Sequence, residues 1–115
     1  MQIVQQRHGE VGVIAPSGRV DSTTSEALQA AITTVLDDGT TQLVIDLAGV
    51  EYISSAGLRV MLLTAKRLGG GKGALVLCGL GDAVRQVFDL AGLLPLFTVD
   101  VSRQAALGRL AVKPD

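Results

Sequence analysis

The spacing of apolar and polar residues along the chain predicts alternating strands and helices. Two apolar segments at residues 3–4 and 11–15 flank a turn at residues 8–10 and predict two leading strands. Residues 23–26 then have the sequence of a capping box, which starts a helix, and Gly39 is suited to its C-cap. The apolar residues of this helix recur at three- and four-residue steps: Ala27, Leu28, Ala31, Ile32, Val35 and Leu36.

The second half of the chain continues the same alternation. Residues 43–47 are almost continuously apolar, which is typical of a central strand covered on both faces. A helix at 56–68 carries apolar residues around most of its circumference, Leu63 among them, so we expect it to be largely buried. Further strands are predicted at 74–78 and 96–99, and further helices at 82–94, where Pro95 stops the helix, and after Ser102, which is suited to cap it.

The resulting element order, ββαβαβαβα, predicts an α/β fold. Alternating strands and helices form a mixed, mostly parallel β-sheet, here of about five strands with about four α-helices packed on it. Neither a repeat nor a linker divides the chain, so we expect residues 1–115 to form a single domain whose last few residues fray. Hydrophobic residues make up 48% and aromatic residues only 3%, so the core is expected to be aliphatic.

The charge balance argues against nucleic acid as a partner. The chain has 10 Lys and Arg residues and 11 Asp and Glu residues, whereas nucleic-acid binding requires clustered basic charge. The N-terminus lacks the basic-then-apolar layout of a signal peptide, and no apolar run approaches the roughly 20 residues that cross a membrane. We therefore expect a soluble cytoplasmic protein that does not insert into a membrane.

The chemistry expected of most enzymes is missing. His8 is the single histidine and Cys78 the single cysteine, so neither a catalytic triad nor a metal site can be assembled in the usual way. The glycine-rich segment around Lys72 lacks the Ser or Thr of a P-loop, and Gly79-Leu80-Gly81 lacks the third glycine of a dinucleotide site. We expect ordinary turns at both segments, no catalytic residue, no metal and no cofactor; Cys78 is expected to be a buried apolar residue.

Two adjacent serines stand where the predicted helix at 56–68 begins. The segment is Ser54-Ser55-Ala56-Gly57-Leu58, and it follows the apolar strand after a short spacer at residues 48–53. Backbone N–H groups at a helix N-terminus have no intrahelical partner and favour negative charge, so a phosphate on such a serine would be stabilised by its own helix. The alternative is that Ser55 is a plain N-cap, which contributes about 1 kcal/mol.

These residues carry a resemblance to a known family. Asp46-Leu47, the spacer ending in Tyr52-Ile53, and residues 54–60 are similar to the signature of STAS domains, and they most resemble the anti-sigma factor antagonists of bacteria. The segment Gly18-Arg19-Val20-Asp21, which leads into a helix, also matches the family pattern. The resemblance implies a STAS fold over nearly the whole chain. One departure is that many members have Asp immediately before the acceptor serine, where this chain has Ser54.

The resemblance also implies a function and a set of site residues. The phosphorylation site would be Ser55, two residues before Gly57. The unphosphorylated form would bind an anti-sigma factor with serine kinase activity and so release a sigma factor. Phosphorylation would end that binding, and a serine phosphatase would restore it. The residues expected to form or shape the partner-binding surface are Asp21, Ser54, Ser55, Gly57, Leu58 and Arg59.

Two alternative functions stay open. The chain could be a STAS subunit that docks in a membrane transport or signalling complex through the same helix. It could instead be a small-ligand or nucleotide sensor that uses Gly79-Leu80-Gly81 and the N-terminus of the helix at 56–68.

Overall fold

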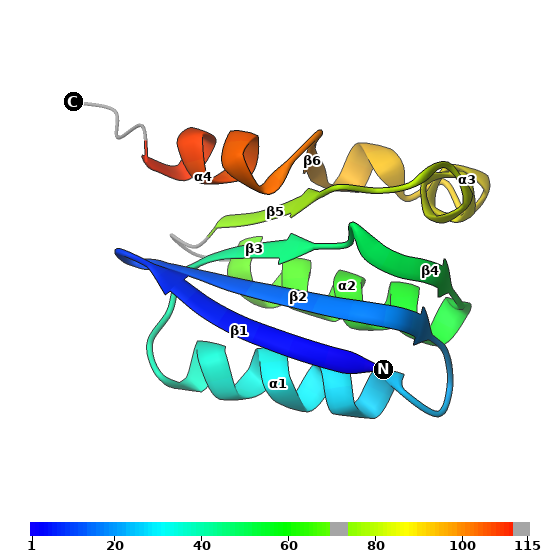
Figure 1. The fold of residues 1–115 in the computed structure, drawn as a ribbon, viewed down its shortest axis with the longest axis horizontal. Coiled ribbons are helices and arrows are strands. Elements are labelled where there is room, and N and C mark those ends of the chain that lie inside the picture. The colour runs from blue at the N-terminus through cyan, green and yellow to red at the C-terminus, as the bar shows by residue number, and fades with distance from the viewer. Residues whose placement is uncertain (70–73, 112–115) are drawn as a thin grey trace.

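A six-stranded sheet with helices on both faces forms the centre of the computed structural model, which describes residues 1–69 and 74–111 (Figure 1). The glycine-rich turn expected at 70–73 and the fraying expected at 112–115 lie outside the described residues. The strands are β1 (Gln2–His8), β2 (Val11–Val20), β3 (Gln42–Asp46), β4 (Gly49–Ile53), β5 (Ala74–Cys78) and β6 (Thr98–Asp100). The helices are α1 (Ser25–Asp37), α2 (Ser55–Gly69), α3 (Asp82–Leu90), a 3-10 helix (Leu94–Leu96) and α4 (Arg103–Ala111).

The sheet is mixed and mostly parallel, as the sequence predicts. Its main path runs β1-β2-β3-β5-β6, with β1 antiparallel to β2 and the other pairs parallel. The strand β2 is long enough to have two partners on the same side. Its first residues, Val11 to Ile14, pair with β3, and its last residues, Ser17 to Val20, pair with β4.

The strand β4 is an element that the sequence analysis missed, because it treated residues 48–53 as a spacer. The observed order is therefore ββαββαβαβα, with six strands rather than five. The chain bends after β3, where an Asp46 carboxylate oxygen accepts the N–H of Ala48 at 3.0 Å. In β4, Val50 and Ile53 are buried whereas Glu51 and Tyr52 are exposed, so the segment lacks the alternation that marks a strand in sequence.

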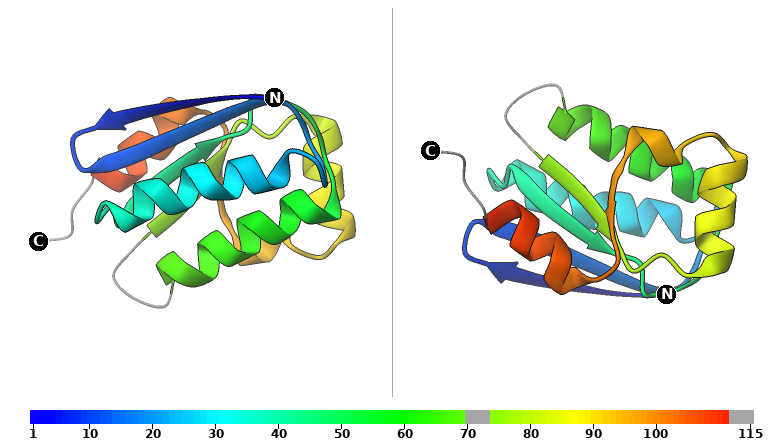
Figure 2. Two further views of the ribbon diagram at one scale, coloured as in Figure 1. Left: turned by 90° about the horizontal axis from the view of Figure 1, so that it is seen from below. Right: turned by 90° about the horizontal axis from the view of Figure 1, so that it is seen from above.

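The helices divide the core into two layers. Figure 2 shows α1 and α2 side by side on one face of the sheet and α4 on the other. The larger apolar cluster lies under α1, α2 and α3, and Phe88 packs there edge-on against Phe97, with ring centroids 5.6 Å apart. The smaller cluster lies under α4 and consists of Val11, Val13, Val44, Val76, Cys78, Ala106 and Leu110. Apart from this aromatic pair the core is mostly aliphatic, as expected from the composition.

The start of α1 differs from the predicted capping box. The Thr24 hydroxyl donates to the carbonyl oxygen of Arg19 at 2.8 Å and accepts the N–H of Asp21 at 2.9 Å, so it makes no cap bond to the helix. The carboxylate of Asp21 instead accepts the N–H groups of Thr23 and Thr24, at 3.0 and 3.2 Å. The predicted C-cap is confirmed, since Gly39 has a φ of +97° and donates to the Leu36 carbonyl oxygen.

Helix α3 is shorter than predicted. It ends at Leu90 rather than residue 94, because Gly92 takes a φ of +73° and donates to the carbonyl oxygen of Asp89. Pro95 then lies in the 3-10 helix, and the strand expected at 96–99 begins at Thr98. Ser102 caps α4 as predicted, since its hydroxyl oxygen accepts the N–H of Ala105 at 3.1 Å.

Helix α2 is buried less completely than its apolar sequence suggests. Leu63 is 42% exposed, whereas Leu58, Val60, Met61 and Leu68 are buried as expected. None of the helices in the described part of the chain is long and apolar enough to cross a membrane.

A polar network holds α4 against the sheet. The Arg103 side chain donates to an Asp46 carboxylate oxygen at 2.9 Å and to the side-chain oxygen of Gln6 at 2.8 Å, which links α4 to β3 and β1.

Cys78 lies fully buried near Asp46. Burial, with a smaller contribution from the Asp46 carboxylate, raises the pKa of the Cys78 thiol to about 12, so the thiol is protonated at neutral pH. Cys78 is therefore the buried residue that the sequence predicts.

Candidate phosphorylation and partner-binding site

The two serines lie at the end of the β2–β4 pair, where α2 begins. The N–H of Ser54 donates to the carbonyl oxygen of Val20 at 2.8 Å, and Val20 also pairs with Ile53 in the strand register. Asp21 directly follows Val20. The tertiary structure thus brings Asp21, Ser54 and Ser55 to the same end of the sheet, although Asp21 is far from the serines in sequence.

The two serines have different environments. Ser55 is the first residue of α2 and is exposed. Ser54 stands in the N-cap position, because its carbonyl oxygen accepts the N–H of Leu58 at 3.0 Å, but its hydroxyl oxygen is buried and has no hydrogen-bond partner among residues 1–69 and 74–111. The alternative of a plain N-cap at Ser55 is therefore wrong, because Ser55 lies inside the first turn and Ser54 occupies the cap position without capping. Of the two hydroxyls, that of Ser55 is accessible.

Gly57 is required by close packing. A Cβ atom at this position would lie 2.6 Å from Cγ1 of Ile53 and 2.8 Å from Cγ1 of Val20. The start of α2 therefore rests directly on the last residues of β4 and β2. Leu58, the next residue, is buried in the larger core cluster. Gly57 and Leu58 thus shape the predicted surface from beneath, whereas Ser55 and Arg59 are exposed on α2.

Arg19 and Tyr52 interact beside the serines, and the sequence did not predict this contact. Arg19 and Tyr52 are register partners in β2 and β4, and the Arg19 guanidinium lies 4.3 Å from the centre of the Tyr52 ring. The Nε atom of Arg19 is also 3.9 Å from a carboxylate oxygen of Asp21. Both residues belong to the quoted signature segments, but their contact depends on β4 being a strand.

Asp21 supplies a fixed negative charge at this end of the sheet. The hydroxyl of Thr23 donates to its carboxylate at 2.7 Å, and this bond, followed by the bond from the Thr23 N–H, holds the pKa of Asp21 below its usual range. The carboxylate is therefore ionised at neutral pH. The surface around Ser55 thus contains a negative charge at Asp21 and positive charges at Arg19 and Arg59.

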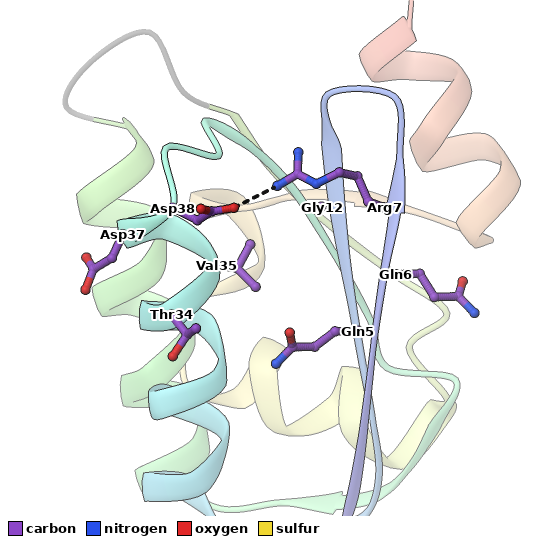
Figure 3. Close-up of a pocket in the computed structure, with 8 residues that line it drawn as sticks. All are labelled: Gln5, Gln6, Arg7, Gly12, Thr34, Val35, Asp37 and Asp38. Carbon is purple, nitrogen blue, oxygen red and sulfur yellow. Dashed lines mark ion pairs between the residues drawn. The ribbon is translucent and has the colours of Figure 1, made fainter.

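A groove and a glycine turn share no residue with the predicted partner-binding set. A groove of about 560 Å³ runs between β1 and the end of α1, where Arg7 and Asp38 form an ion pair of 3.8 Å (Figure 3). None of its lining residues belongs to the predicted partner-binding set. Gly79 has a φ of +71°, and a Cβ atom there would lie 2.9 Å from Asp46 Oδ1, so the turn itself requires this glycine. Its N–H is bonded to the carbonyl oxygen of Asp100.

Sequence comparisons identify relatives of the chain. Residues 2–106 match the STAS domain. BtrV of Bordetella bronchiseptica, provisionally named an anti-sigma factor antagonist, is 48% identical over 89 residues, which cover 77% of each chain. The anti-sigma-F factor antagonist RsfB of Mycobacterium tuberculosis is 40% identical over 62 residues, which cover 54% of this chain and 51% of RsfB.

Solved structures with the same fold carry similar names. An anti-sigma factor antagonist from Mycobacterium paratuberculosis superposes with a TM-score of 0.89 at 32% identity, over 96% of this chain and 94% of the other. The anti-sigma factor antagonist SpoIIAA in its unphosphorylated form has a TM-score of 0.83 at 22% identity, over 99% of this chain and 100% of that one, and has the same fold. Because the STAS domain matches most of the chain and BtrV is 48% identical to it, the chain belongs to the STAS domain family.

Proposed function

We propose that this protein is an anti-sigma factor antagonist that is switched off by phosphorylation of Ser55. Its unphosphorylated form binds an anti-sigma factor with serine kinase activity in the cytoplasm, and the sigma factor held by that partner is released. A serine phosphatase returns the phosphorylated form to the active state. The names of the relatives support this function, and SpoIIAA, which has the same fold, is known in both an unphosphorylated and a phosphorylated form.

The observation that carries the assignment of Ser55 is the contrast between the two serine hydroxyls. The Ser54 hydroxyl oxygen is buried, whereas Ser55 is exposed. A kinase must reach the hydroxyl oxygen with the γ-phosphate of ATP, so an accessible hydroxyl is required. The first-turn N–H groups of α2 and the helix dipole then stabilise the added negative charge.

The proposed partner surface is centred on the exposed residues Ser55 and Arg59 and includes the half-buried Asp21. Asp21 and Arg59 contribute charge, while Ser54, Gly57 and Leu58 hold the start of α2 in place. This chain contributes no catalytic residue to the cycle, because the ATP and the groups that activate it belong to the kinase.

Phosphopeptide mapping tests the assignment. The partner is first isolated by pull-down with the tagged chain and identified by mass spectrometry, and it is then incubated with ATP and three versions of the protein. The wild type and Ser54→Ala should both become phosphorylated on Ser55, whereas Ser55→Ala should remain unmodified. Phosphate found on Ser54 alone would overturn the assignment.

A further inference from the structure

Arg59 is placed to reach a phosphate on Ser55. The two residues are four positions apart on α2, and both are exposed. Residues at this spacing are neighbours on a helix surface, with Cβ atoms about 5–6 Å apart. Helical side chains also lean toward the N-terminus and cover the preceding turn. The guanidinium of Arg59 therefore extends toward the turn that begins with Ser55.

Arg59 also has no competing partner within residues 1–69 and 74–111, where it makes no ion pair, hydrogen bond or ring contact. Two other arginines near α2 are occupied. Arg19 lies over Tyr52 and near Asp21, and Arg67 pairs with Asp37 at 2.6 Å. The first turn of α2 contains no acidic residue that could take up Arg59. In the unphosphorylated protein the Arg59 guanidinium therefore faces solvent.

We propose that Arg59 is the intramolecular counter-ion of phosphorylated Ser55. This inference rests on the proposed function, in which the kinase transfers the γ-phosphoryl group of ATP to the Ser55 oxygen, the hydroxyl proton is released and ADP leaves. The phosphate carries a charge of about −1.5 to −2 at pH 7. Arginine binds such a group through two parallel N–H···O bonds, and a negative group N-terminal to a positive one at this spacing is the favourable order.

The pairing changes how the switch works. Before phosphorylation, Arg59 offers an unpaired positive charge to the partner. Afterwards the phosphate both adds negative charge and engages Arg59, so the partner loses an attractive contact and meets a repulsive one. The neighbouring strands bring three other charged side chains to this end of the sheet: Arg19, Asp21 and Glu51. Asp21 already accepts bonds from Thr23 and Thr24. Within the described residues, Arg59 is the unoccupied cation on α2 that lies one turn from Ser55.

The test uses the full chain with phosphoserine incorporated at position 55 during translation, so that no kinase is needed. Phosphorus NMR follows the titration of the phosphate in the wild type, Arg59→Gln and Lys66→Gln. Lys66 is an exposed cation on the same helix, and its backbone lies about 16 Å along the helix from Ser55 at 1.5 Å per residue. This distance exceeds the Debye length of about 8 Å in physiological salt. Lys66 is therefore the matched control for the loss of one positive charge.

The phosphate should titrate at a higher pH in Arg59→Gln than in the wild type, and Lys66→Gln should titrate like the wild type. The Arg59→Gln substitution should also lower the melting temperature at pH 8. The decrease should be about 2 °C larger in the phosphorylated protein than in the unphosphorylated protein. Equal titration midpoints in all three proteins would overturn the pairing. The proposed function would fail on a different observation, namely that the kinase leaves Ser55 unmodified.

Discussion

The N–H of Ser54 donates a 2.8 Å hydrogen bond to the carbonyl oxygen of Val20. This bond joins the start of α2 to the end of β2 and sets Asp21 and the serine pair at one end of the sheet. Gly57 reinforces the junction, because its missing side chain lets α2 approach Val20 and Ile53 closely. The candidate phosphorylation site is therefore held by the core itself and does not depend on a loose loop.

Removing the Ser54 hydroxyl should not weaken the fold. The Ser54 hydroxyl oxygen is buried and has no partner in the described part of the chain, so Ser54→Ala should leave the free energy of unfolding unchanged or raise it. The matched control is Ser102→Ala, which removes a hydroxyl that does cap a helix and should cost about 1 kcal/mol. Urea unfolding of both variants measures the difference. Equal losses would show that Ser54 caps α2 after all.

A methyl group at position 57 should destabilise the protein. The Cβ atom added by Gly57→Ala would overlap Ile53 and Val20, and overpacking of this kind costs roughly 1–3 kcal/mol. Gly108→Ala is the control, because Gly108 lies within α4 with open space around it and alanine is the better helix former there. The melting temperature should fall for the first variant and stay level or rise for the second. A rise in both would mean that α2 does not pack tightly on the sheet.

Charge at position 55 should control partner binding. Ser55→Ala keeps the surface neutral and should bind the anti-sigma factor like the wild type. Ser55→Asp should weaken binding by at least about tenfold, because a like charge that is desolvated at an interface costs several kcal/mol. The effect should be smaller than that of phosphorylation, because aspartate carries less charge than phosphate. Gln104→Asp, which adds the same charge to the first turn of α4 on the other face of the sheet, is the control and should bind normally. If calorimetric titration gave Ser55→Ala and Ser55→Asp the same affinity, a charge switch would be excluded.

Phosphorylation should block contact without unfolding the domain. Negative charge at an exposed helix N-terminus is favourable by roughly 0.3–1 kcal/mol, and repulsion from Asp21 opposes it in part. Both effects are small against a typical stability of about 5–15 kcal/mol. The phosphorylated protein should therefore melt cooperatively within a few degrees of the unmodified protein. A melting temperature lowered by more than about 10 °C would indicate that the switch is unfolding.

Acid should weaken the ion pair between Asp100 and Arg109. Both Asp100 carboxylate oxygens accept bonds from Arg109, at 2.8 and 2.9 Å, and these bonds hold the pKa of Asp100 below its usual range. Because the folded-state pKa is depressed, the stabilisation is fully present above about pH 4, the pKa of an unfolded Asp, and is lost as the pH falls through the folded-state value.

Thermal unfolding between pH 7 and pH 2 measures this loss. Asp100→Asn should be less stable than the wild type at pH 7, and the difference should shrink below pH 4. Arg109→Gln removes the same bonds and should behave alike. A difference between wild type and Asp100→Asn that stays constant down to pH 2 would show that the ion pair makes no contribution.

Local patterns in the sequence were sufficient for most of the fold. The three- and four-residue spacing of apolar side chains predicts α1, the mostly apolar sequence at 56–68 predicts α2, and the uninterrupted apolar runs predict β3 and β5. The Gly39 and Ser102 caps were also predicted correctly, because each involves residues within one helical turn. The STAS signature led to the family and to the serine pair, since those residues are contiguous in the chain.

Features that depend on contacts between distant residues were decided by the tertiary structure alone. Residues 49–53 form the strand β4 because they pair with the last residues of β2. No pattern within residues 49–53 predicts this pairing. The same pairing brings Arg19 onto Tyr52 and Asp21 beside the serines. Burial distinguishes the hidden hydroxyl of Ser54 from the accessible Ser55, although the two are identical and adjacent in sequence. The sequence could name the serine pair, but only the packing of α2 against β2 and β4 determines which hydroxyl a kinase can reach.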